Sequence, residues 1–156
     1  MNNIIVKDDI FDLETQQYFI DDVKKVNFDK LDNVYQINND KTTTVNTELR
    51  YYYRALIRNI LHYYKTDIIV NSVNIKRTLK NSNNEVVLPN DMYKFVAIYY
   101  IDDTDGEILI FQDNILKEKI HPKKGRAVIF SSNYSYIDNT PKNFDYKKTM
   151  NINFNV

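Results

Sequence analysis

Few of the side chains in this chain are of the types that usually carry out chemistry. There are two histidines, His62 and His121, and no cysteine. The carboxylates of Asp102, Asp103 and Asp105 are grouped in the sequence, and Ca²⁺ accepts oxygens of this kind. Their spacing is not that of an EF-hand, so a solvated β-turn is the alternative interpretation. We find no Ser-His-Asp grouping, P-loop or glycine-rich phosphate loop.

The most informative pattern lies between residues 94 and 136. It reads KFVAIYYID at 94–102, then Gly106-Glu107-Ile108, then PKKGR at 122–126, followed by FSSN at 130–133. These segments resemble the double-stranded β-helix core of the 2-oxoglutarate- and iron(II)-dependent oxygenases, in the prolyl-hydroxylase-like and phage-encoded branches. The resemblance implies a jelly-roll or cupin-like barrel with bracing helices. It also implies a structural role for Arg126 in the "GR" pair.

The same resemblance implies iron ligands that the sequence does not supply. A His-x-Asp is expected shortly before Phe95, and a second His is expected shortly after Asn133. If Asp91 is the carboxylate, Pro89 stands where the first His is expected, and Tyr136 stands near the second position. The two imidazoles of a facial triad provide most of its affinity for Fe(II), so we expect no cofactor and no bound metal.

Three further residues have a functional and a structural interpretation. Tyr136 is either a phenolate ligand or an aromatic residue that lines the barrel. Lys147 and Lys148 fall about where the family places the basic residue that pairs with 2-oxoglutarate, and a cation there can bind an anion. The alternative is that both are solvated lysines at the start of an edge strand.

The composition narrows the classes of function. The chain has 156 residues, the size of one domain, and 21 basic and 21 acidic side chains give a net charge of zero. A nucleic-acid partner is therefore not expected, and the apolar runs are too short to cross a membrane. The amino-terminal sequence does not resemble a signal peptide. Abundant Asn, Ile, Lys and Tyr favour an AT-rich gene, as in many phages, so we expect a cytoplasmic or virion-associated protein.

The periodicity predicts an α+β chain. Short strands are predicted at 4–6 and 34–37, with one helix from about 12 to 26, where Asp12 is the N-cap, and a second helix at 46–65. We expect Leu56 and Ile60 in the core, and His62 and His121 at the surface. Eight strands follow, at 68–75, 85–88, 93–101, 107–111, 115–120, 127–130, 134–137 and 149–156. We expect one domain, residues 1–156, with a helical part at 1–66 and a β-helix core at 67–156.

The sequence predicts a catalytically inactive, oxygenase-like domain that serves as a structural or protein-binding module, in a virion in the most concrete version. One alternative is an oxygenase with an atypical metal site that uses Asp91, Tyr136 or Asp138. Another is a barrel that binds a small anion or a sugar. The 13 tyrosines favour a protein partner or a homo-oligomer, with Tyr51 and Tyr63 as candidate contacts.

Overall fold

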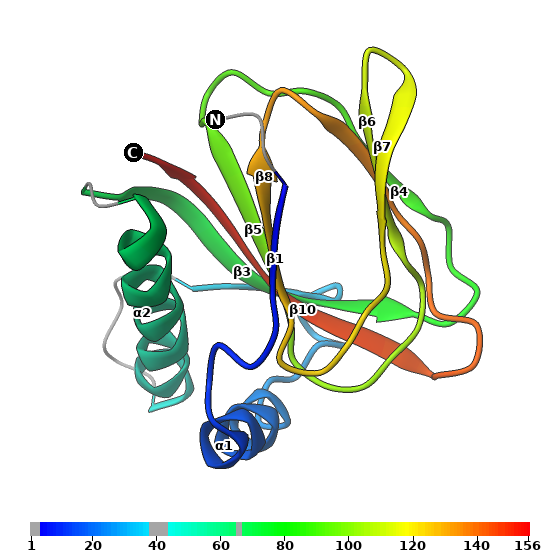
Figure 1. Cartoon of the computed structure of the whole chain (residues 1–156). Coiled ribbons are helices and arrows are strands. Elements are labelled where there is room, and N and C mark those ends of the chain that lie inside the picture. Colours follow the sequence, from blue (N-terminus) through cyan, green and yellow to red (C-terminus); the bar gives the residue numbers. More distant parts are fainter. Residues whose placement is uncertain (1–3, 38–43, 65–66) are drawn as a thin grey trace.

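The chain folds into two β-sheets that face each other, with two helices on the outer side of the larger sheet (Figure 1). The computed structural model describes residues 4–37, 44–64 and 67–156, and within the second helix it describes the side chains of residues 48–59. Neither helix in these ranges is long and apolar enough to cross a membrane. The elements are β1 (Ile5–Lys7), α1 (Leu13–Val23), β2 (Val34–Gln36), α2 (Thr44–Tyr64), β3 (Ile69–Leu79), β4 (Glu85–Val87), β5 (Phe95–Tyr100), β6 (Ile108–Gln112), β7 (Ile115–Ile120), β8 (Ala127–Ser131), β9 (Ser135–Asp138) and β10 (Tyr146–Asn155).

The major sheet has the strand order β1-β8-β5-β10-β3-β2, and the minor sheet has the order β4-β9-β6-β7. All the pairs are antiparallel. From β3 onward the chain passes back and forth between the two sheets, apart from the β6–β7 hairpin, which lies within the minor sheet; this arrangement is that of a jelly roll. The predicted α+β class and double-stranded β-helix are confirmed. Strands β1 and β2 come from the amino-terminal part of the chain and extend the major sheet at its two edges.

Alternation of side chains along β5 and β10 gives the major sheet two different faces. Tyr99, Met150 and Ile152 point outward into the core under α1 and α2, whereas Val96, Ile98 and Tyr100 point into the barrel. Strand β5 lies between β8 and β10 with all six residues buried, which explains why its sequence is apolar on both faces.

The helices begin and pack as their sequences predict. Asp12 is the N-cap of α1, and its carboxylate accepts a hydrogen bond from the Thr15 amide at 2.7 Å. Phe19 of α1 stacks on Tyr52 of α2, with 4.1 Å between the ring centroids. Leu56 is fully buried, which confirms its predicted core position, whereas the side chain of Ile60 lies outside the described residues.

Candidate functional site

The interior of the barrel is divided into an apolar and a polar half. The apolar half is built by β5, β6 and β8, with Ile98, Ile110 and Phe130 among its buried residues. The polar half is built by β3 and β10 of the major sheet and by β4 and β9 of the minor sheet. It encloses a cavity of about 370 Å³, which we call the polar cavity, lined by Val34, Asn74, Lys76, Glu85, Val87, Tyr93, Tyr136, Asp138, Asn151 and Asn153.

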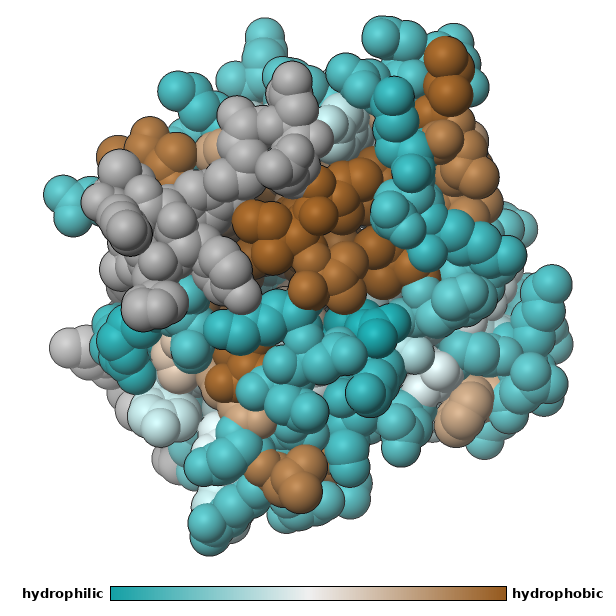
Figure 2. Space-filling model, in the orientation of Figure 1, coloured by the Kyte–Doolittle hydropathy of each residue, from teal (hydrophilic) through white to brown (hydrophobic). Residues whose placement is uncertain are grey.

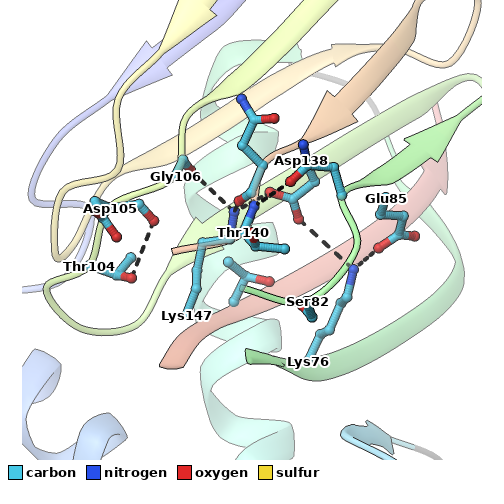
Figure 3. A network of polar contacts seen from close by, with 12 residues as sticks. Lys76, Ser82, Glu85, Thr104, Asp105, Gly106, Asp138, Thr140 and Lys147 are labelled. Atoms are coloured by element: carbon cyan, nitrogen blue, oxygen red, sulfur yellow. Dashed lines mark hydrogen bonds and ion pairs between the residues drawn. The ribbon is translucent and has the colours of Figure 1, made fainter. Parts of the chain in front are cut away.

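A network of charged side chains joins the two sheets beside this cavity (Figure 3). Lys147 of β10 is fully buried. Its ammonium group donates to the carboxylate of Asp138 on β9 and to the carbonyl oxygens of Gly106, at 3.1 Å, and Asn139. An ammonium group has three N–H bonds, so each donor of Lys147 already has an acceptor within the chain.

A second lysine completes this network. Lys76 of β3 forms an ion pair with Glu85 of β4, and its Nζ lies 3.9 Å from a carboxylate oxygen of Asp138. Burial lowers the pKa of Lys76; the Asp138 carboxylate raises it, and the nearby Lys147 lowers it further. The two lysines come from one sheet and the two acids from the other, so the network ties the sheets together.

Lys147 and Lys148 do not lie at the edge of the sheet. Strand β10 lies between β3 and β5, so the interpretation of two solvated lysines on an edge strand is wrong. The sequence does not indicate that the last strand of the chain is inserted between two other strands, and for this reason the buried position of Lys147 was not predicted. Lys148 is half-buried, and its Nζ lies 5.9 Å from the centre of the Tyr146 ring. The two neighbouring lysines point to opposite faces, as strand geometry requires.

The predicted remnants of the metal site do not converge on one point. Pro89 and Asp91 are exposed in the loop after β4, and Asp91 lines a separate cavity of about 320 Å³ with Ser131 and Asn133. Tyr136 lines the polar cavity, as the interpretation of a barrel-lining aromatic predicts. Its ring meets Phe130 edge-on at 5.2 Å. Burial raises the pKa of Tyr136, and the negative charge of Asp138 raises it further, which disfavours a phenolate.

Within the acidic group at 102–105, Asp105 has a structural function in the loop between β5 and β6. Asp105 accepts hydrogen bonds from the backbone amides of Lys142 and Asn143, at 2.9 and 3.1 Å. It also accepts one from the Asn143 side chain at 2.8 Å. Across the part of the chain that the structure describes, no three His, Cys, Asp or Glu side chains are grouped so that they could hold a metal ion.

The remaining candidates lie away from the polar cavity. His121 is exposed, as predicted, and its carbonyl accepts a hydrogen bond from Arg126. Arg126 also forms two hydrogen bonds with the carboxylate of Asp8, at 2.7 and 3.1 Å, which fixes the segment after β1 against the turn before β8. The side chains of His62 and Tyr63 lie outside the described residues.

The fold defines the structural class: the chain has the double-stranded β-helix fold that is also found in the 2-oxoglutarate- and iron(II)-dependent oxygenases. Among similar structures is an oxidoreductase of the 2OG-Fe(II) oxygenase family from Burkholderia pseudomallei, with 12% identity, a TM-score of 0.77 and coverage of 97% of this chain and 83% of that one. A prolyl hydroxylase from Trichoplax adhaerens has 11% identity and a TM-score of 0.73, with coverage of 99% and 84%. A viral collagen prolyl hydroxylase from Paramecium Bursaria Chlorella virus-1 has 14% identity and a TM-score of 0.64, with coverage of 97% and 88%. At these identities the similarity establishes the fold. No protein-family model and no curated protein sequence matches the chain.

The residues in the barrel do not fit the iron and 2-oxoglutarate that this fold class implies. Glu85 and Asp138 are the carboxylates at the polar cavity, and each is paired with a lysine. A divalent cation placed there would lie beside the ammonium groups of Lys76 and Lys147, and like charges repel strongly where burial lowers the dielectric. Lys147 has no N–H left for the carboxylate of 2-oxoglutarate.

Proposed function

We propose that this domain is a noncatalytic module, which uses the oxygenase fold as a scaffold for binding. The observation that carries the proposal is the pairing of Glu85 and Asp138 with Lys76 and Lys147 inside the barrel. In this arrangement tethered ammonium groups neutralise the carboxylates, and no bound cation is required. A fold can persist after the residues of its original site are replaced, so the architecture alone does not imply the chemistry.

The competing proposal is an oxygenase with an atypical metal site that uses Asp91, Tyr136 or Asp138. Asp91 lines a different cavity from the other two. Asp138 is bonded to Lys147, and the raised pKa of Tyr136 keeps its phenol protonated at neutral pH. These three positions therefore offer a poor set of donors for Fe(II).

Calorimetry with Mn(II), an air-stable stand-in for Fe(II), tests the proposal directly. We expect no site of micromolar affinity, with or without added 2-oxoglutarate. The Asp91→Ala and Tyr136→Phe variants should behave as the wild type does. A stoichiometric site in the wild type that either substitution abolishes would refute the proposal and support the oxygenase.

The surface supports binding through contact with a protein, either a second copy or another component of an assembly. Figure 2 shows an apolar area over β1 and toward the β6–β7 hairpin. A groove there is lined by Ile4, Ile5, Val6, Gln112, Lys117, Glu118 and Tyr134, and Val6 is 44% exposed at the edge of the major sheet. Apolar surface with a charged rim is typical of protein interfaces. The resemblance to phage-encoded members makes a virion component the most concrete form of this proposal.

The structure shows which of the tyrosines are exposed enough to contact a partner. Only Tyr18, Tyr51 and Tyr146 are exposed among the tyrosines whose side chains are described. Tyr18 donates a hydrogen bond to Glu14, and the ring of Tyr146 contacts Arg77 at 5.0 Å. Tyr51 on α2 is 57% exposed and contacts the ring of Tyr52. Tyr51 is therefore the described tyrosine best placed to meet a partner.

Tyr51→Ala and Val6→Ser test the two candidate contacts, and Tyr18→Ala is a matched control because Tyr18 is 56% exposed on the other helix. Light scattering over a concentration series measures self-association, and capture from the native source measures hetero-association.

Loss of an interface anchor should weaken association by about thirtyfold, which corresponds to roughly 2 kcal/mol. Association that neither variant changes would show that both surfaces are free of partners. A protein that stays monomeric, captures nothing and turns over 2-oxoglutarate would refute the module itself.

A further inference from the structure

The polar cavity contains hydrogen-bonding groups that the charged network does not use. Three asparagines, Asn74 on β3 with Asn151 and Asn153 on β10, line it from the major sheet. Tyr136 of β9 and Tyr93, which lies in the segment between β4 and β5, also line it. All five side chains are half-buried, so each is held by the fold and still reaches the cavity.

Side-chain hydrogen bonds between β3 and β10 fix the orientation of the asparagines. The Asn151 side-chain amide donates to the Asn74 oxygen at 3.3 Å and to the Thr149 hydroxyl at 3.1 Å. The Asn153 amide donates to the Ser72 hydroxyl at 2.9 Å. Each carboxamide has two donors and an acceptor oxygen. The amide group of Asn74 and the acceptor oxygens of Asn151 and Asn153 therefore remain available, as far as the described residues are concerned.

The two phenols add groups that both donate and accept. Within the described part of the chain, the hydroxyl groups of Tyr93 and Tyr136 make no hydrogen bond, and burial raises the pKa of both. They therefore stay protonated at neutral pH. Their rings give the cavity an apolar wall beside the polar groups, which suits a ligand with both C–H and O–H surfaces.

The charges around the cavity select against ions. Lys76 and Lys147 bring two positive charges, and Glu85 and Asp138 bring two negative charges, so the network is neutral when all four groups are charged. A free anion would have to compete with a carboxylate for each lysine, and a free cation would have to displace a lysine. A neutral ligand meets neither obstacle.

We propose that the polar cavity binds a neutral, hydroxyl-rich ligand: one sugar ring, either free or at the end of a glycan. A hydroxyl group donates and accepts at once, so it matches a cavity that offers amide N–H groups, amide oxygens and phenols on its different sides. The cavity of about 370 Å³ is at the small end of the usual range for ligand pockets and suits a single ring. This inference rests on the proposed function, because a catalytic iron with 2-oxoglutarate would need the same space.

The asparagine side chains provide the readout, because their amide groups give separate signals in a ¹⁵N–¹H NMR spectrum. We would titrate the whole domain with glucose, galactose, mannose and N-acetylglucosamine. Saturable shifts should appear for Asn74, Asn151 and Asn153. Asn155, whose amide bonds to Asn71 at 2.9 Å outside the cavity, is the internal control and should not shift.

Two substitutions then separate binding from folding. Tyr136→Phe removes one hydroxyl and keeps the ring, and it should weaken binding of the preferred sugar by about tenfold, the equivalent of one hydrogen bond. Asn153→Ala should weaken binding similarly, whereas Asn155→Ala should leave it unchanged. An unaltered spectrum elsewhere in the domain shows that each variant is folded.

The outcomes distinguish the failure of sugar binding from the failure of the proposed noncatalytic function. The inference is overturned if none of the four sugars gives a saturable shift, or if Tyr136→Phe and Asn153→Ala bind as the wild type does. A saturable shift with phosphate or 2-oxoglutarate in place of sugars overturns it too, since the ligand is then an anion. Paramagnetic broadening by stoichiometric Mn(II) around Asp138 would instead refute the noncatalytic function.

Discussion

Replacing Lys147 with methionine tests the role of the buried network most directly. The substitution keeps an unbranched side chain one atom shorter and removes the ammonium group, which is fully buried and bonded to three acceptors. Removing one partner of a buried ion pair costs about 3–5 kcal/mol, because the other charge is left without compensation. Each carbonyl oxygen left without a donor adds roughly 1–3 kcal/mol unless water reaches it. We expect a loss of at least about 3 kcal/mol, a large fraction of the roughly 5–15 kcal/mol that stabilises a typical domain.

Urea unfolding at neutral pH, followed by circular dichroism, measures this loss. Lys76→Met is the matched comparison, because its side chain is 22% exposed and its partner Glu85 is 48% exposed, and pairs near solvent contribute roughly 0–1 kcal/mol. Adding Asp138→Asn to Lys147→Met should restore part of the stability, with a coupling energy of about 0.5–3 kcal/mol. Equal, small losses for Lys147→Met and Lys76→Met would show that the network does not hold the sheets together.

Three further predictions follow from packing and titration. Gly106→Ala should cost more stability than Gly125→Ala, although both glycines have a positive φ, 91° and 84°. At Gly106 the new Cβ would lie 2.5 Å from a backbone oxygen, which cannot easily move. At Gly125 it would lie 2.7 Å from a side-chain amide, which can move. Equal losses in urea would contradict this. Leu56→Ala should cost about 2–5 kcal/mol, and a loss below about 0.5 kcal/mol would place that side chain at the surface. Burial raises the pKa of Tyr99 and Tyr100, so above their ordinary value of 10.0 the folded state keeps protons that the unfolded chain releases. Stability should therefore fall as the pH rises past about 10, and a flat alkaline profile would contradict the burial of both phenols.

Much of the fold was predictable because apolar residues follow the period of each element. The strand predicted at 115–120 is observed with the same bounds, and the other predicted strands differ by up to four residues at an end. Met150, Ile152 and Phe154 alternate with asparagines, and this alternation matches the two faces of β10, because the three apolar side chains are buried and the asparagines are half-buried. The β-turn offered as the alternative for the acidic group is not observed, since residues 103–106 form an irregular loop held by Asp105.

The site was less predictable, because its charges are brought together by pairing of distant strands. Each ion pair, Lys76–Glu85 and Asp138–Lys147, joins residues only nine positions apart, but the two pairs meet because β3 pairs with β10 and β4 pairs with β9. One local signal was available. Lys76 is an odd number of positions from Val73 and Ile75 in β3, and Lys147 is an odd number of positions from Met150 in β10. Because side chains along a strand point to opposite faces in turn, each lysine is on the face opposite the core that packs against the helices. Applied to both strands, that alternation places the two lysines inside the barrel.

The register of the minor sheet explains why lysines are needed at this point. Glu85 on β4 lies directly opposite Asp138 on β9, and like charges in facing positions destabilise a sheet unless a cation lies between them. Lys76 and Lys147 supply that charge from the other sheet. A tethered ammonium differs from a metal ion because it cannot dissociate, exchange ligands or change its coordination. If the noncatalytic proposal holds, the same contacts take the place of a metal ion and tie the two sheets together, and they keep the asparagines and tyrosines of the polar cavity in position for the proposed ligand.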